Sequence, residues 1–124
     1  LVYAVTDGNY KNTGLYAARA DEQGVSSIVV LRAIQRHLYR LYQVSKAAQS
    51  GESVADAMNN LNPPVFFTFK GRFQKQLGMW TPSLLEKALF LLLKTEISCK
   101  TSQIPERAVF ERCLFRTAQL PKRG

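Results

Sequence analysis

Apolar residues recur every three or four positions along most of this chain, which is the spacing of one face of an α-helix. The longest such pattern begins after Ser26 or Ser27, continues to about Ser50 and ends at Gly51. Its apolar face is formed by Ile28, Leu31, Ile34 or Gln35, Leu38, Leu41 and Tyr42. Strand-like alternation never extends beyond a few residues, and no fixed-period repeat is present. The pattern therefore predicts an all-α fold.

Capping residues and glycines divide the flanking sequence into shorter helices. The first is expected to begin near Asp7 or Asn9, either of which can cap it, and to end at Gly24. A second short helix is expected after Ser53, which is also suited to an N-cap position. These signals predict helices on both sides of the long one.

Asn62-Pro63-Pro64 then interrupts the helical pattern, because neither proline donates a backbone N–H. Residues 65–69 are rich in aromatic and β-branched side chains and are compatible with a strand. An isolated strand has no partner to pair with. We therefore interpret this segment as an extended turn that leads into a helix over about residues 70–79.

Thr81-Pro82 is a strong helix start, with threonine at the N-cap and proline at the first helical position. The helix is expected to reach Lys100. Residues 88–93 are all apolar, so the middle of this helix is hydrophobic nearly all round. A helix of that kind is normally buried, and we expect it to be the central helix of the fold.

Pro105 is expected to begin a last helix and Pro121 to stop it, which leaves residues 121–124 as a charged tail. Residues 1–120 then form one helical domain, an antiparallel bundle of five to six helices joined by short connections. The length of 124 residues suits a single domain. The chain lacks an initial methionine and opens in the middle of a pattern, so we expect a fragment of a longer protein.

The basic charge is concentrated in the second half of the chain. The formal net charge is +8. Residues 1–64 carry six basic and five acidic side chains, whereas residues 65–124 carry eleven basic and four acidic ones. A one-sided excess suits an anionic partner such as nucleic acid or an acidic protein surface. The alternative is a solvated basic face.

No arrangement of residues suggests catalysis or ligand binding. His37 is the only histidine, and its place beside Arg36 is more typical of a boundary residue than of a general base. Cys99 and Cys113 lie in apolar stretches and are typical of small core residues. They are too few for a zinc site or a disulfide scaffold, which favours a reducing compartment. We expect no metal, no cofactor, no small-molecule substrate and no membrane span.

Two features could serve a partner. Arg32, Arg36 and Arg40 are spaced four residues apart. They could form a docking stripe for acidic groups, or they could be a solvated face. The segment Pro63-Pro64-Val65-Phe66-Phe67 could be an interaction edge or could seal one end of the bundle. The candidate partner-binding residues are Arg32, Arg36, Arg40, Pro64, Phe66, Phe67, Lys70, Arg72 and Lys75.

Four segments, taken in order, resemble the motifs of one protein family. Residues 24–38, ending in Leu31-Arg32-Ala33-Ile34-Gln35-Arg36-His37-Leu38, resemble the family's "L-L-R-A-L-x-R" helix, with Ser27 where proline is common. Residues 62–70 resemble its "R-P-P-V-F-F-K-R-K" stretch, although Thr68-Phe69 replaces more basic residues. Trp80-Thr81-Pro82 resembles a following "W-S/T-x-x-x-L" helix start, and residues 95–100 resemble an "x-E-x-x-L-K" helix end. In these motifs and their order, the chain resembles the C-terminal domain of the bacterial DNA polymerase III delta subunit.

The resemblance implies a domain of a clamp loader, the assembly that places the ring-shaped sliding clamp on primed DNA. The delta subunit's two N-terminal AAA+-type domains are absent from this sequence. Its C-terminal helical domain joins gamma/tau- and delta-prime-type subunits in a circular collar and has no catalytic residue. The sliding clamp and primed DNA are met through the full-length protein. Such a subunit is bacterial, cytoplasmic and nucleoid-associated.

Two other classes of function stay open on the residues alone. A free-standing basic helical DNA-binding domain is compatible with the charge, but no recognition helix with an obvious set of base-reading side chains is present. A small all-α enzyme is disfavoured, because no pair of groups is arranged for proton transfer.

Overall fold

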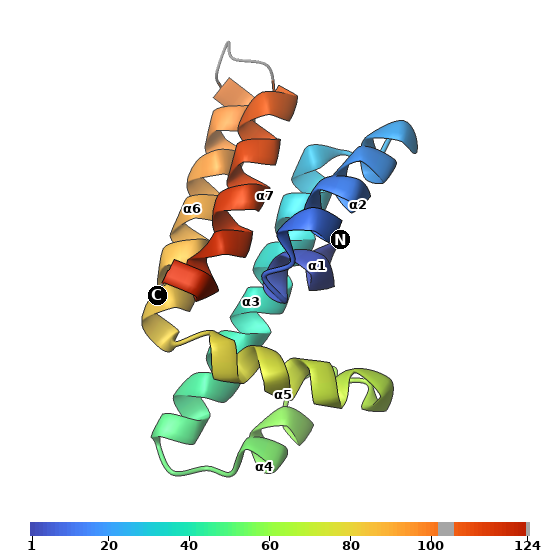
Figure 1. Ribbon diagram of the computed structural model, residues 1–124. Helices are drawn as coiled ribbons and strands as arrows, with labels where there is room; N and C mark the ends of the chain where they lie inside the picture. The colour runs from blue at the N-terminus through green and yellow to red at the C-terminus, as the bar shows by residue number, and fades with distance from the viewer. Residues whose placement is uncertain (102–105, 124) are drawn as a thin grey trace.

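The computed structural model describes residues 1–101 and 106–123, and all regular structure within them is helical (Figure 1). The elements are α1 (Val2–Thr6), α2 (Tyr10–Glu22), α3 (Ser27–Gln49), α4 (Val54–Asn59), the 3₁₀ helix η1 (Phe67–Phe69), α5 (Lys70–Met79), α6 (Pro82–Thr101) and α7 (Glu106–Arg123). The predicted all-α fold is confirmed. The additional helix is α1, which is too short to show a helical repeat in the sequence. Pro105, the expected start of the last helix, lies outside the described residues.

Short polar side chains cap several of these helices where the sequence predicted it. The Asn9 side chain accepts a hydrogen bond from the backbone N–H three residues further on, at 3.0 Å, and begins α2. Ser53 and Thr81 do the same for α4 and α6, at 3.1 and 3.2 Å. Asp7, the alternative start, instead ends α1. Ser26 precedes α3 without a side-chain cap.

Glycines end the two helices for which the sequence predicted them. Gly24 follows α2 with φ of +74°, and Gly51 follows α3 with φ of +99°. A side chain strains this left-handed conformation, whereas glycine adopts it freely. The two glycines therefore mark the C-terminal ends of α2 and α3.

The four long helices α2, α3, α6 and α7 stand side by side, while α4 and α5 lie across the lower end of α3 (Figure 1). Arg32 of α3 contacts Glu96 of α6, and Tyr42 contacts Glu86. The later residue of α3 thus contacts the earlier residue of α6, so these two helices are antiparallel. The largest fully buried side chains include Leu31, Ile34, Leu38, Leu41, Met58, Phe73, Trp80, Leu85, Leu92 and Leu114. Full burial of one such side chain is worth roughly 1.5–3 kcal/mol.

The expectation that α6 is the central helix is wrong, because α3 holds that place. Among the described elements, α3 packs against α1, α4, α5, α6 and α7, whereas the main partners of α6 are α3 and α7. Leu85, Ala88 and Leu92 of α6 are buried, but Phe90 and Leu93 are more than half exposed. The hydrophobic middle of α6 therefore has one face in the core and one at the surface.

The expectation that Pro121 stops the last helix is also wrong, since α7 continues through it to Arg123. Proline removes one backbone donor, but its φ is compatible with a helix. One lost hydrogen bond near a helix end is tolerated. Residues 121–123 thus form the end of α7 and not a separate tail.

The segment after the prolines is not a strand. Val65 is buried, and η1 leads directly into α5, as an extended turn entering a helix predicts.

Within the described ranges, no helix combines the length and the apolar character that crossing a membrane requires.

Candidate interaction surfaces

The first arginine of α3 is engaged within the fold. Arg32 Nε lies 3.4 Å from Glu96 Oε1 on α6, and Lys100 Nζ lies 3.4 Å from Glu96 Oε2. The hydrogen bond from Arg32 holds the pKa of Glu96 below its ordinary value. Arg32 is about half exposed, so this pair aligns two helices and adds little to stability.

The three arginines of α3 do not form one flat patch. Four residues advance a helix by slightly more than one turn, so each step rotates the side chain by about 40°. Arg32 therefore points toward α6, Arg36 is exposed, and Arg40 is half-buried on the side of α1, where its charge acts on Tyr3. Of the predicted stripe, Arg36 is the member most open to a partner.

The basic residues of α5 also differ in whether they have a partner within the fold. Arg72 forms an ion pair with Asp7, with Nε 2.9 Å from Oδ2, and its guanidinium lies 4.7 Å from the centre of the Tyr3 ring. Lys70 Nζ lies 3.5 Å from an asparagine oxygen of α4. Lys75 is exposed. Arg72 thus fastens α5 to the N-terminal helix, a contact between distant segments that sequence patterns do not predict.

His37 is buried, with 8% of its surface exposed, and so it is not the boundary residue that we expected. Its Nε2 lies 2.6 Å from Gln76 Oε1, and Gln76 Nε2 donates to Asp7 Oδ1 at 2.6 Å. Beside this chain of bonds, Trp80 Nε1 donates to the Thr6 carbonyl at 2.8 Å. These contacts join α1, α3 and α5 into one junction.

The hydrogen bonds of this junction connect helices. Because the amide nitrogen of Gln76 faces a carboxylate, its oxygen faces His37, and the histidine Nε2 carries the proton. Burial lowers the pKa of His37, which keeps the ring neutral. A neutral ring whose Nε2 proton is already donated to an amide has no role as a general base at that atom.

The aromatic segment divides into an exposed part and a part that packs onto the fold. Phe66 and Phe67 are 66% and 76% exposed, and Pro64 beside them is exposed too. Phe69 stacks on a tyrosine of α1 at 4.8 Å, and Phe73 is fully buried. We call Pro64, Phe66 and Phe67 the phenylalanine tip.

A second apolar surface lies where α3 meets α6. Val29, Leu93 and Ile97 are 58%, 52% and 54% exposed. Each lies within one helical turn of an end of the Arg32–Glu96 contact. We call these three residues the α3–α6 apolar face. The sequence signal was the hydrophobic run of α6, which we read as burial on all sides.

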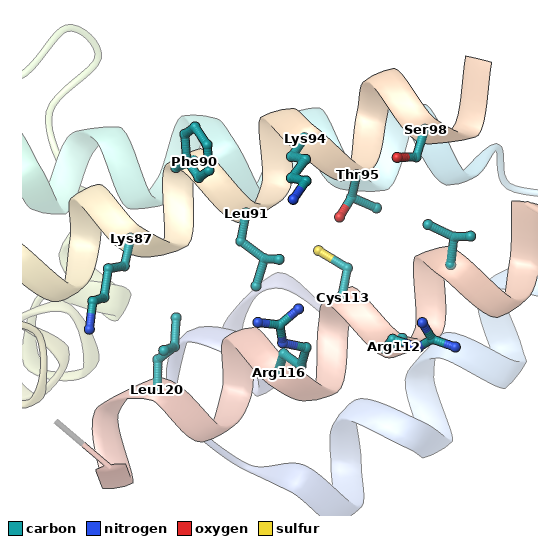
Figure 2. Close-up of a pocket in the computed structure, with 11 residues that line it drawn as sticks. Lys87, Phe90, Leu91, Lys94, Thr95, Ser98, Arg112, Cys113, Arg116 and Leu120 are labelled. Carbon is teal, nitrogen blue, oxygen red and sulfur yellow. The ribbon is translucent and has the colours of Figure 1, made fainter. Parts of the chain in front are cut away.

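A groove of about 500 Å³ runs between α6 and α7 (Figure 2). Lys87 and Lys94 line it from α6, and Arg112 and Arg116 line it from α7. No carboxylate belongs to its described lining. Sequence reasoning missed these four residues, because the register between two helices cannot be read from either one alone.

The floor of the groove combines aliphatic side chains with the hydroxyl groups of Thr95 and Ser98. Leu91, Val109 and Leu120 line it, and the Cys113 sulfur lies between the two helices (Figure 2). Burial raises the pKa of Cys113, so it is a thiol and not a nucleophilic thiolate. Its expected role as a small core residue is confirmed, while Cys99 is half-buried at the edge of the core. Among the described residues, no cluster of histidine, cysteine and carboxylate side chains could hold a metal.

Comparison with known proteins gives a partial match to a replication protein. The chain is similar to a probable DNA polymerase III subunit delta of Rickettsia prowazekii (strain Madrid E), with 29% identity over 79 residues. The match covers 64% of this chain and 25% of the relative, so the chain matches about a quarter of that protein's length. No protein-family model matches the chain, and no solved structure does. What the comparison supports is a likeness between most of this helical domain and part of a delta subunit.

Proposed function

We propose that this chain is the C-terminal helical domain of a delta-type clamp-loader subunit and that it joins neighbouring loader subunits in a collar. Its partners are gamma/tau- and delta-prime-type subunits, and the full-length protein meets the sliding clamp and primed DNA through other domains. The similarity to a delta subunit carries this proposal. The ordered motifs described above support it. The role of the domain is assembly and not chemistry.

The exposed apolar groups are the surfaces that suit assembly. Phenylalanine side chains exposed by two-thirds or more, as in the phenylalanine tip, lose unfavourable contact with water when a partner covers them. The α3–α6 apolar face offers a second patch beside the Arg32–Glu96 ion pair. Arg36 and Lys75 supply exposed charge for the polar rim of such contacts.

A pull-down tests the proposal at the phenylalanine tip. Full-length protein carrying Phe66→Ser and Phe67→Ser should capture gamma/tau- and delta-prime-type subunits of the same organism at least tenfold less well than the unchanged protein. The matched control is Leu15→Ser with Val54→Ser, which removes two other exposed apolar side chains. Equal capture by the tip variant and the unchanged protein would show that the phenylalanine tip is not part of the interface.

The arginine stripe is tested separately by Arg32→Ala, Arg36→Ala and Arg40→Ala in the full-length protein. We expect weaker assembly at moderate salt, with the Arg36 change giving most of the effect, because Arg32 is paired with Glu96 and Arg40 is half-buried. Unchanged assembly of the triple variant would exclude the stripe.

The alternative function is free-standing DNA binding, and the net charge of +8 favours it. It predicts that the isolated chain binds duplex or primed DNA with micromolar or tighter affinity that weakens steeply with salt. A titration without binding at physiological salt would remove it. Assembly with loader subunits in the same buffer would leave the collar proposal standing.

A further inference from the structure

The α6–α7 groove brings like charges together without a compensating acid. Lys94 from α6 and Arg116 from α7 extend into the groove from opposite walls (Figure 2). The acids that are closest in sequence to the groove cations have other partners: Glu86 accepts a hydrogen bond from Tyr42, Glu96 pairs with Arg32 and Lys100, and Glu111 pairs with Arg107. Opposed cations repel each other unless an anion lies between them. Within the described part of the chain, no side chain supplies that anion.

From this arrangement we propose that the α6–α7 groove binds an acidic amphipathic helix of a partner protein. The aliphatic side chains of Leu91, Val109 and Leu120 take the apolar face of that helix. The cations of the walls take carboxylates on its two flanks. The lining of α6 extends from Lys87 to Ser98, which at 1.5 Å per residue is about 16 Å, or three turns of a bound helix.

Nucleic acid fits this groove less well. Single strands are held by stacking bases on aromatic side chains along a basic track. Phe90 is the one aromatic side chain of the described lining, so the groove offers little surface on which bases could stack. A phosphodiester backbone has no apolar face to cover Leu91 or Val109. The proposal concerns a surface separate from the phenylalanine tip, and it holds whether or not the chain belongs to a clamp loader.

The probe is a synthetic 18-residue helical peptide with leucine at positions i, i+3, i+4 and i+7 and glutamate on both flanks. It is titrated into the ¹⁵N-labelled 124-residue chain, and amide shifts are followed by NMR. We expect saturable binding, with the largest shifts between residues 87 and 98 and between residues 109 and 120. The affinity should fall at least threefold when salt is raised from 50 to 300 mM.

Charge reversal locates the contact. Lys94→Glu with Arg116→Glu should weaken peptide binding at least tenfold. The matched control is Lys11→Glu with Lys46→Glu, which changes the net charge equally at exposed positions outside the groove. The control should change the affinity less than threefold. Lys94→Gln with Arg116→Gln provides a milder variant, and circular dichroism verifies that each variant folds.

Any of five results would overturn the proposal. Shifts that map outside the groove, or no saturable binding, would exclude the site. Equal binding by a peptide with serine in place of leucine, or an equal loss in the control variant, would show unspecific charge attraction. Tighter occupation of the groove by an 18-nucleotide thymidine strand would assign it to nucleic acid.

Discussion

The α1–α3–α5 junction and the α6–α7 groove use polar side chains in opposite ways. In the junction, Asp7, His37, Arg72 and Gln76 satisfy one another, and the Trp80 ring is hydrogen-bonded beside them. In the groove, four cations line a partly aliphatic floor with no carboxylate in the described lining. The two regions come from one chain of net charge +8. Charge alone therefore does not identify a binding surface, because it does not show which charged groups already have partners within the fold.

This difference separates residues that hold the fold from residues available to a partner. Arg72 belonged to the predicted partner-binding set, yet its ion pair with Asp7 makes it part of the framework. Lys94 and Arg116 did not belong to that set, yet they face each other across an open groove. We expect changes in the junction to cost stability and changes in the groove to leave stability nearly unaltered.

The largest effect is expected from Trp80→Ala. The side chain is fully buried, and its indole N–H is bonded to the Thr6 carbonyl. Removal leaves a cavity and an unpaired carbonyl, which should lower the free energy of unfolding by about 3–5 kcal/mol. Because Trp80 is the only tryptophan, the variant has no tryptophan fluorescence. Urea unfolding is therefore followed by circular dichroism. Trp80→Phe should cost less, and an equal cost for both variants would contradict the packing argument.

A smaller loss is expected from Gln76→Leu. The substitution keeps most of the side-chain volume but leaves the His37 donor unpaired and removes one hydrogen bond to Asp7. An unsatisfied buried polar group costs about 1–3 kcal/mol. The exposed neighbour Gln74→Leu serves as the control and should change stability by less than about 0.5 kcal/mol. A neutral result for Gln76→Leu would mean that the junction does not stabilise the fold.

The junction should also make stability depend on pH. Burial lowers the pKa of His37, with a further contribution from the nearby Arg40, so the unfolded chain takes up a proton more readily than the folded chain. The free energy of unfolding is then highest when the pH is above 6.5, the ordinary pKa of histidine, and it decreases as the pH falls below that value. Urea midpoints between pH 7.5 and 5.5 should decline for the natural chain. His37→Gln should give a flatter profile, and identical profiles would disprove the assignment.

The smallest effect is expected from Lys94→Gln with Arg116→Gln. These surface changes should alter the free energy of unfolding by less than about 0.5 kcal/mol. The sign should be stabilising, because the opposed charges repel each other. Thermal unfolding at low and high salt measures it, and the gain should shrink as salt screens the repulsion. A loss above 1 kcal/mol would show that the groove residues support the fold and would erase the contrast with the junction.

Local signals predicted most of the helices. Asn9, Ser53 and Thr81 cap their helices, and Gly24 and Gly51 end theirs, because these effects depend on only a few neighbouring residues. The same reasoning failed for Pro121, where the rest of α7 outweighs one missing donor.

Properties that depend on packing between helices were not predictable. The exposure of Phe90 and Leu93 depends on which face of α6 meets α3, and the burial of His37 depends on α1 and α5. Among the candidate partner-binding residues, the exposed Arg32 and Arg72 are paired within the fold, whereas the other exposed members are Arg36, Pro64, Phe66, Phe67 and Lys75. The pairing of Arg32 with Glu96 and of Arg72 with Asp7 arises between segments more than sixty positions apart.

The most direct test of the assembly role is sedimentation velocity of the 124-residue chain mixed with gamma/tau- and delta-prime-type subunits of the same organism. The account predicts a faster boundary that contains the chain. It also predicts that this boundary is lost when Phe66 and Phe67 are changed to serine. Sedimentation of the natural chain as a free monomer at micromolar concentrations of every component would contradict the account.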